Sequence, residues 1–417
     1  MRSGRFLSLF FLHSACLLAL FAEASEPARQ PERIILNLTA EPATSMAVTW
    51  CTEVELGEPV VEWAVAAEGT EFVKLAQRLP ARMERWAEPV GAPAYHYSAV
   101  LTGLKPGTRY CYRVGAGLQL SEWNQFTTAE ASAKPFSFVW LGDPQDEITE
   151  HCSRVFREAY RTAPKAAFWL FTGDICGDPL DSQWAEFFGG MGFIARMVPS
   201  IMTPGNHDTA YLLKEGKPDM YRPTYARRDP ARVGQVWLSN LTLPENGVAG
   251  LGETNYHLDY QGLRVIMINS NTRLAEQAAW LEPLLASNPA TWTVVAFHHP
   301  LYNGGAKRDN RQTRDAFLPL FDKYKVDLVL TGHDHVYMRS HPLREGRVAA
   351  AGEKGTVYLV SASGPKFYEC NTPYPELMAR TASGKQLFQV IEVGADRLSV
   401  RTHSADGVLF DECVIRK

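Results

Sequence analysis

The sequence lacks the features that mark nucleic-acid-binding, membrane-spanning or zinc-finger proteins. Its 42 basic and 46 acidic residues nearly balance, without a long run of either sign, and give no reason to expect nucleic acid as a partner. It has no CxxC or other zinc-type cysteine spacing. It also lacks internal repeats, and no apolar segment after the first two dozen residues approaches the ~20 residues of a membrane span. These absences indicate a soluble globular protein, and its 417 residues are enough for two domains.

The first two dozen residues differ in kind from the rest. Two arginines precede an apolar stretch over 6–21, and AEA at 22–24 has the small-x-small pattern of a signal-peptidase site. We expect a signal peptide over 1–24, and hence a secreted or periplasmic protein without a stable membrane anchor. The alternative is an uncleaved anchor, for which the apolar stretch is short.

Six cysteines remain once this segment is removed, and an even number in an oxidising compartment permits disulfides. Strand parity disfavours one pairing. If 45–51 and 108–114 are strands with their aromatic side chains facing inward, Cys51 and Cys111 both point outward. They cannot meet if these strands lie in opposite sheets. Two NLT sequons, at 37 and 240, leave glycosylation open.

Residues 25–130 are predicted to form an all-β domain. Short alternating strands arrive at the spacing of a β-sandwich. They are MAVTWCTEV, PVVEWAVAA, HYSAVLTGL, TRYCYRVGA and SEWNQFTTA. The segment LTGLKPGTRYCYRV resembles the E-to-F corner of a fibronectin type III domain, which is usually a scaffold. AEASAKP, at 129–135, is predicted to be a linker.

Residues 131–417 are predicted to form an α/β domain, because β-rich apolar runs alternate with amphipathic helical patterns. Strands are expected at 136–141, 167–172, 199–203, 263–268, 293–297, 326–330 and 356–361, and helices at 147–161, 274–286 and 313–324. A Pro-containing insert over 212–250 shows no clear periodicity and is expected to pack over one face. The final segment alternates as antiparallel strands would.

Polar side chains follow five of these strands. The segments are LGDPQD, FTGDICG, TPGNHD, AFHHPLY and LTGHDHVY. Each alone could be a turn or a cap, but ligands of open α/β sheets collect outside the carboxyl ends of the strands. Carboxylate, amide and imidazole together favour Zn, Mn or Fe over a thiolate-selected metal. The sequence therefore predicts one polar cluster with enough donors for two metal ions that share a bridging carboxylate.

In this order, the motifs resemble those of the calcineurin-like metallophosphoesterases, and among them the purple acid phosphatases, which also carry an N-terminal fibronectin-like domain. The resemblance covers nearly the whole mature chain. It implies a four-layer αββα sandwich and two divalent or mixed-valence metal ions, Fe, Zn or Mn. The ligands it implies are Asp143 and His335 for the first ion, Asp174 as the bridge, and Asn206, His298 and His333 for the second.

The resemblance also implies catalytic residues. His207 would be the acid or hydrogen-bond donor at the phosphoryl and leaving-group oxygens, and Asp208 would orient its ring. His299 is the one additional imidazole in the loop where plant enzymes place histidines near the substrate. Lys307, Arg308 and Arg311 in this loop could contact a charged substrate, or could simply be solvated.

Two positions depart from the family pattern near the first metal. Purple acid phosphatases have a tyrosine three residues after the bridging aspartate, and its bond to ferric iron gives their colour; here the residue is Gly177. We therefore predict that the iron-loaded protein lacks an intense tyrosinate band. Many calcineurin-like enzymes place a histidine ligand two residues after the first aspartate, where this chain has Gln145. The Gln145 oxygen is a candidate ligand, with a simple turn or surface glutamine as the alternative.

The function most consistent with these features is an exported phosphatase that hydrolyses phosphomonoesters by metal-activated hydroxide attack on a phosphorylated small molecule. A phosphodiesterase or nucleotidase shares the motif set, since substrate choice resides in loops such as 212–250. From another class, a non-catalytic adhesion or carbohydrate-binding module is suggested only by the sandwich domain.

Overall fold

The computed structural model describes residues 30–86, 94–214, 217–218 and 227–417. The expected signal peptide over 1–24 lies outside these residues. Within the described part of the chain, no helix is both long and apolar enough to cross a bilayer.

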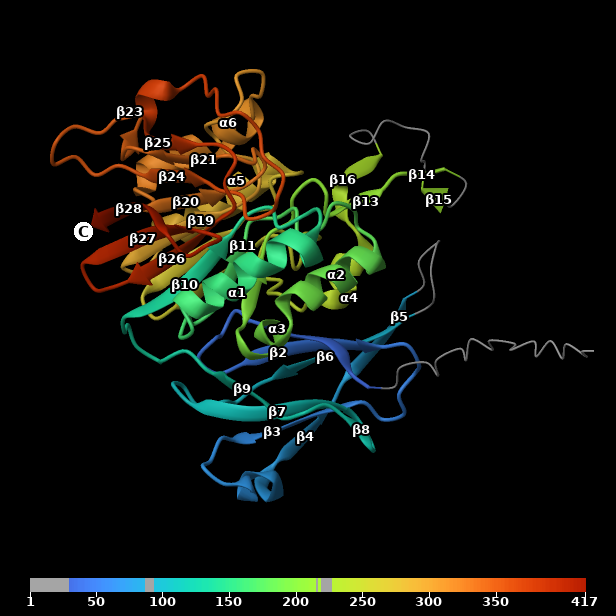
Figure 1. The fold of residues 1–417 in the computed structure, drawn as a ribbon. Coiled ribbons are helices and arrows are strands. Elements are labelled where there is room, and N and C mark those ends of the chain that lie inside the picture. The colour runs from blue at the N-terminus through green and yellow to red at the C-terminus, as the bar shows by residue number, and fades with distance from the viewer. Residues whose placement is uncertain (1–29, 87–93, 215–216, 219–226) are drawn as a thin grey trace, which may run out of the picture.

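The N-terminal domain is a β-sandwich, as predicted (blue to cyan in Figure 1). One sheet contains β1 (Glu32–Asn37), β2 (Met46–Thr52), β6 (Ala94–Leu101) and β5 (Arg82–Trp86). The other contains β4 (Gln77–Pro80), β3 (Val60–Val65), β7 (Arg109–Ala116), β8 (Gln119–Leu120) and β9 (Asn124–Thr127), and η1 (Thr70–Leu75) follows β3. The Tyr110 hydroxyl accepts a hydrogen bond from the Lys105 amide at 2.8 Å. This tyrosine corner supports the predicted likeness to fibronectin type III domains.

Cys51 on β2 and Cys111 on β7 lie in opposite sheets, which is the condition under which the parity argument disfavours their pairing. All six cysteines of the described chain are free.

Both asparagines of the NLT sequons, Asn37 and Asn240, are buried in the folded chain.

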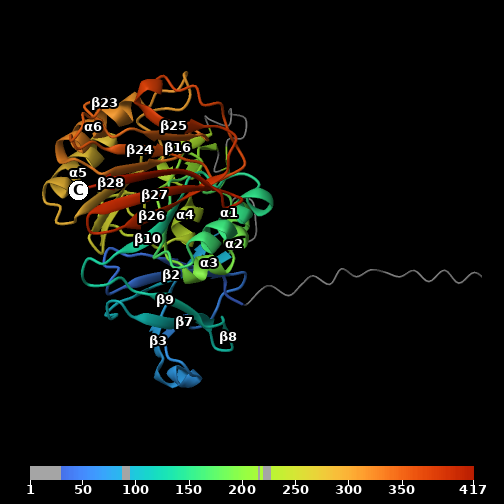
Figure 2. The same ribbon diagram turned by 60° about the vertical axis from the view of Figure 1, so that its left-hand side comes forward.

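The α/β domain has two stacked mixed sheets with helices outside each, which is the predicted four-layer arrangement (Figures 1 and 2). The first sheet orders β28 (Leu409–Arg416), β27 (Arg397–Ser404), β26 (Leu387–Val393), β10 (Phe136–Leu141), β11 (Trp169–Phe171) and β12 (Ser200–Met202). The second orders β17 (Tyr256–Tyr260), β18 (Leu263–Met267), β19 (Trp292–Ala296), β20 (Leu328–Thr331), β24 (Val357–Val360), β21 (Tyr337–Ser340) and β25 (Met378–Ala382). All seven predicted strands are present, and the C-terminal strands are antiparallel as expected.

Aromatic side chains fill the space between the two sheets. Tyr260 of the second sheet lies 4.8 Å from the Phe136 ring and 5.2 Å from the Phe168 ring, measured between centroids. Outside the first sheet lie η2 (Ile148–Cys152), α1 (Ser153–Thr162), α2 (Asp181–Met191) and α3 (Phe193–Met197). Outside the second lie α5 (Leu274–Ala286) and α6 (Arg311–Tyr324), whose apolar faces pack on it. The three predicted helices are confirmed, whereas α2 and α3 were not predicted.

The predicted insert folds into short elements. These are β13 (Thr209–Tyr211) paired with β16 (Arg228–Val233), β14 (Leu213–Lys214) paired with β15 (Lys217–Pro218), and α4 (Gln235–Asn240). Elsewhere, β22 (Leu343–Arg344) pairs with β23 (Arg347–Val348), and η4 (Pro375–Leu377) precedes β25. Part of the insert lies outside the described residues.

The two domains share one sheet, which the sequence did not predict. β1 pairs in parallel with β12 through Asn37 and Ser200, so a ten-stranded sheet runs from the sandwich into the α/β domain. The Asn37 amide donates to the Ser200 carbonyl at 3.0 Å and accepts from the Thr242 amide at 3.1 Å. The linker therefore connects domains that are also joined by strand pairing.

Candidate metal centre

The predicted site residues converge where the carboxyl ends of parallel strands from the two sheets meet. Strands β10, β11 and β12 run parallel in the first sheet, and β19 and β20 run parallel in the second. The ligand-bearing loops approach so closely that glycine is needed beside two carboxylates. A Cβ on Gly332 would lie 2.0 Å from Asp143 Oδ2, and one on Gly205 would lie 2.1 Å from Asp174 Oδ1. These loops leave room for the carboxylates only because both positions lack a side chain.

Asp143, Asp174 and His335 form a first group of potential metal donors. Their donor atoms lie within 4.8 Å of one another, and all three side chains are buried. His335 donates from Nδ1 to the Lys366 carbonyl at 3.2 Å, which leaves Nε2 facing the group. The Asp143 carboxylate accepts from the His333 backbone amide at 2.9 Å. Hydrogen bonds from the surrounding backbone thus fix the orientation of the donors, as they do around metal ligands.

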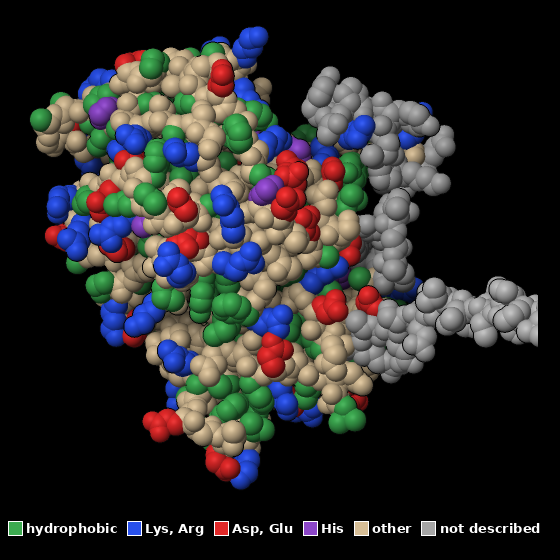
Figure 3. Space-filling model, viewed as in Figure 1, with side chains coloured by type: hydrophobic (Ala, Val, Ile, Leu, Met, Phe, Trp, Pro, Cys, Tyr) green, Lys and Arg blue, Asp and Glu red, His purple; other side chains and the backbone are tan. Residues whose placement is uncertain are grey.

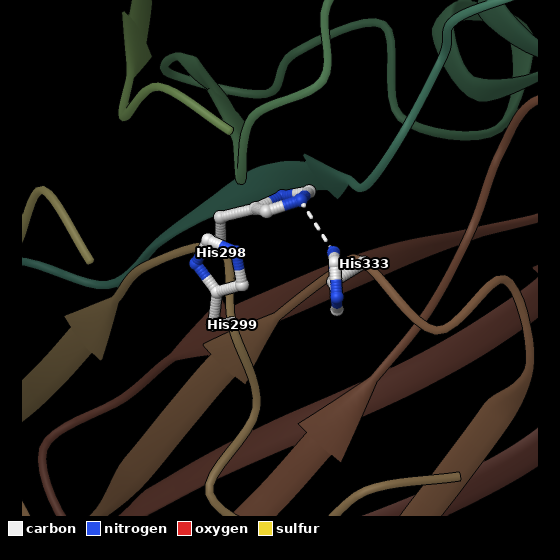
Figure 4. A group of neighbouring side chains, drawn as sticks. All are labelled: His298, His299 and His333. Carbon is white, nitrogen blue, oxygen red and sulfur yellow. Dashed lines mark hydrogen bonds between the residues drawn. The ribbon is translucent and has the colours of Figure 1, made fainter. Parts of the chain in front are cut away.

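His298, His299 and His333 form a second group, also within 4.8 Å (Figure 4). His298 Nε2 lies 3.1 Å from His333 Nδ1. Its Nδ1 donates to the Thr172 carbonyl at 2.9 Å, so Nε2 is the nitrogen that faces the site. The His299 Nδ1 lies 2.8 Å from the Ser270 hydroxyl. His299 therefore lies beside the predicted ligands, and its catalytic role stays a prediction.

Asp174 connects the two groups. Its Oδ2 lies 3.2 Å from His298 Nε2 while its carboxylate also belongs to the first group. The Asn206 Oδ1 lies 3.2 Å from the same His298 nitrogen. An aspartate with donors on both sides is the arrangement that a bridging ligand requires.

The electrostatics of the site favour a cation. Burial, together with the nearby Asp174 carboxylate, raises the pKa of Asp143 well above its usual range. Burial and the neighbouring imidazoles of His299 and His298 hold the pKa of His333 well below its usual range. Burial lowers the pKa of His298, but the Asp174 and Asp143 carboxylates outweigh it and raise that pKa to about 9. The two carboxylates thus draw positive charge onto His298, which a divalent metal ion would supply in place of the proton, and the neutral His333 imidazole offers such an ion a nitrogen donor.

The Gln145 amide lies inside the first group. Its Nε2 lies 3.2 Å from Asp174 Oδ2 and 3.0 Å from His335 Nε2, and the side chain is fully buried. Its Oε1 has no hydrogen-bond partner among the described residues. Rotating the amide by half a turn exchanges the two atoms and points the oxygen at the donors. Gln145 thus lies at the first group and not on the surface.

Gly177 occupies the position of the family's tyrosine, and the half-exposed Asp146 side chain lies beside it. A Cβ at this residue would lie 2.6 Å from Asp146 Oδ1. The Asp146 carboxylate, itself 3.9 Å from Lys366 Nζ, fills the space that a larger residue would enter.

His207 lies next to Asn206, as predicted, but a different residue orients its ring. The His207 Nδ1 donates to the Gly177 carbonyl at 2.5 Å. The Asp208 carboxylate instead accepts from the backbone amides of Gly205 at 2.8 Å and Ile175 at 3.1 Å. The prediction that Asp208 orients the His207 ring was therefore wrong. The buried Asp208 carboxylate instead satisfies two backbone amides of the neighbouring loops, which would otherwise lack a hydrogen-bond partner.

Of the three basic residues in the loop after His298, one is bonded to a neighbouring turn and two are exposed. Arg308 donates to Asp334 Oδ1 at 2.7 Å and to the His333 carbonyl at 3.1 Å, and so holds the GHDH turn. Lys307 and Arg311 are exposed. The role of Arg308 was missed, because its partners lie 25 and 26 residues away in the sequence.

Comparisons with known proteins agree with this architecture. Residues 136–337 match the family model of the calcineurin-like phosphoesterases, and 31–128 match that of the purple acid phosphatase N-terminal domain. An uncharacterized protein of Mycobacterium tuberculosis is 28% identical over 333 residues, covering 72% of this chain and 60% of its own length. Purple acid phosphatase 5 of Arabidopsis thaliana is 23% identical over 322 residues, covering 74% and 71%.

A solved structure shows the same fold. Purple acid phosphatase PPD1 from yellow lupin (Lupinus luteus) seeds superposes with a TM-score of 0.79 at 20% identity, over 93% of this chain and 74% of that one. The two folds therefore agree over both domains.

Proposed function

The chain belongs to the calcineurin-like phosphoesterases, a family of hydrolases, and from this premise we propose that it is an exported binuclear phosphatase of phosphomonoesters. The observation that carries the proposal is the position of Asp174 between two groups of donors. In this proposal, Asp143 and His335 hold one ion, and Asn206, His298 and His333 hold the other. When bound, two ions of Fe, Zn or Mn would lower the pKa of a bound water and neutralise charge on the phosphoryl group.

His207 is proposed to donate to the phosphoryl or leaving-group oxygen. Because its Nδ1–H is held by the Gly177 carbonyl, Nε2 is the ring atom at which a transferable proton is carried. His299, held by Ser270, is proposed to contact the substrate at the second group. Proton donation of this kind contributes about 10²- to 10⁴-fold to rates in enzymes.

Gln145 is proposed to bind the first ion through Oε1, replacing the tyrosine or histidine of its relatives. We expect Gln145→Leu to weaken binding of that ion by about 10- to 100-fold, the range seen when groups that support a metal are lost. Gln145→His should retain binding. Titration calorimetry with Zn²⁺ or Mn²⁺ measures both, and unchanged affinity in Gln145→Leu would rule out the ligand role.

Export is supported by the charged, apolar and small-residue pattern of residues 1–24. On the face seen in Figure 3, Lys and Arg side chains are interspersed with Asp and Glu, which agrees with a small phosphorylated substrate better than with a polyanion.

Activity on a panel of aryl and alkyl phosphomonoesters, phosphodiesters and nucleotides tests the proposal. We expect the metal-loaded protein to prefer monoesters, and Asp174→Ala to abolish turnover. Asp315→Ala removes an exposed carboxylate on α6 and serves as the matched control. Preference for diesters or nucleotides would support the second candidate, and absence of turnover with both ions bound would indicate a binding module.

A further inference from the structure

A backbone carbonyl holds the ring of His207. Gly177 belongs to the loop after β11 and His207 to the loop after β12, and the 2.5 Å contact from Nδ1 to the Gly177 carbonyl joins the two loops. A partner at one ring nitrogen sets both the ring orientation and the nitrogen that is left for chemistry. The position of the Gly177 carbonyl therefore decides where His207 Nε2 points.

Arg228, at the start of β16, contacts both ends of this arrangement. Its Nη2 donates to the Gly177 carbonyl at 3.0 Å, and its Nη1 donates to the His207 carbonyl at 2.5 Å. Nη1 also lies 3.3 Å from the Thr209 carbonyl. One guanidinium thus bridges the carbonyl that orients the ring and the backbone that carries it.

The guanidinium itself is held by two further residues, Asp178 and Tyr211. It pairs with Asp178 and lies 4.8 Å from the centroid of the Tyr211 ring. The Tyr211 hydroxyl donates to the same Asp178 oxygen at 2.7 Å. The Arg228 side chain is only 8% exposed. A paired, stacked and buried arginine of this kind is a rigid element, not a solvated charge.

We infer that Arg228 is a positioning residue that fixes the His207 ring for proton donation to the leaving group. This inference rests on the proposed function, since it assumes that His207 acts on the substrate. Lysine could not replace Arg228, because one ammonium nitrogen cannot span both carbonyls and Asp178 with the planar fork of a guanidinium. The insert that carries Arg228 thereby takes part in catalysis without contacting the substrate.

The alternative is that Arg228 only anchors the insert. The two roles predict different effects of replacing Arg228 on the hydrolysis rates of different substrates. A p-nitrophenolate group leaves without a proton, whereas an alkoxide needs one. Loss of proton donation therefore slows alkyl phosphates more than aryl phosphates, while loss of a structural anchor slows both alike.

The test compares kcat for an alkyl phosphate and p-nitrophenyl phosphate in metal-loaded wild type, Arg228→Met, His207→Ala and the double variant. We expect Arg228→Met to lower kcat for the alkyl phosphate by about 10- to 100-fold more than for the aryl phosphate. Little further loss is expected on the His207→Ala background. Arg232→Met is the matched control, since Arg232 lies on the same strand but is exposed and pairs with Asp229. It should behave as wild type.

Equal losses on both substrates, additive losses in the double variant, or no loss would each overturn the inference. If Arg228→Met does not fold, as judged by its thermal melt, Arg228→Lys is scored by the same criteria. If wild type hydrolyses no phosphate ester, the proposed function fails separately. The positioning role is then decided by crystal structures of wild type and Arg228→Met, in which an unmoved His207 ring would reject it.

Discussion

At the scale of single residues, four of the candidate ligands have a strained backbone conformation. Asp143, Asp174, His333 and His335 have φ values of 44°, 49°, 70° and 46°, in the left-handed region. Each such conformation costs a non-glycine residue about 1 kcal/mol or more, although aspartate and histidine tolerate it better than most. Strain of this kind persists where surrounding contacts enforce it, and it clusters at functional sites. The fold therefore places these four side chains at the candidate metal centre although their backbone conformations reduce local stability.

Gly205 should be essential for metal binding although it offers no ligand. Gly205→Ala places a Cβ 2.1 Å from Asp174 Oδ1 and must displace the proposed bridge. We expect the variant to fold but to lose at least one bound ion per chain, as measured by elemental analysis. Gly189→Ala is the control, because a Cβ there meets nothing within 4 Å and should stabilise α2 by about 0.5–1 kcal/mol. Full metal content in Gly205→Ala would show that Asp174 is not held where we describe it.

At the scale of elements, strand ends were predictable and the contacts that orient the ligands were not. The alternation of apolar strands and helices predicted the layers, and each of the predicted ligands lies two to four residues after the end of a strand. The roles of Arg228 and Asp208 depend on contacts between loops that only the folded chain brings together. Arg228 reaches a carbonyl 51 residues away, and Asp208 an amide 33 residues away. No local pattern in the sequence encodes these partners.

His96, on β6, should make stability depend on pH. Burial lowers its pKa to about 4, against about 6.5 in an unfolded chain. Between these two values His96 is protonated in the unfolded state and neutral in the folded state. The free energy of unfolding therefore decreases as pH falls from about 6.5 toward 4. The loss amounts to about 2 kcal/mol at pH 5.

Denaturant melts at pH 7 and pH 5 measure this effect. His96→Gln should reduce the difference between the two pH values by that amount, whereas His341→Gln, at an exposed position, should leave it unchanged. An unchanged difference in His96→Gln would show that His96 titrates as it does in the unfolded chain.

At the scale of the whole molecule, the shared ten-stranded sheet predicts that the two domains fold as one unit. We expect a single calorimetric transition in which both domains melt together. Asn37→Ala removes the hydrogen bonds to Ser200 and Thr242, and although the Ser200 carbonyl keeps the bond from the Leu38 amide at 3.4 Å, the Thr242 amide loses its partner, at a cost of about 1–3 kcal/mol. The whole transition should therefore move to lower temperature. Two separate transitions, with only one of them shifted, would show that the sandwich folds independently.

The most direct test of the metal centre is anomalous diffraction from crystals of the protein loaded with Zn²⁺ or Mn²⁺. We predict two ions, both in contact with the Asp174 carboxylate, one beside Asp143 and His335 and the other beside His298 and His333. A single ion, or ions that do not share Asp174, would contradict the binuclear site on which the proposed phosphatase activity depends.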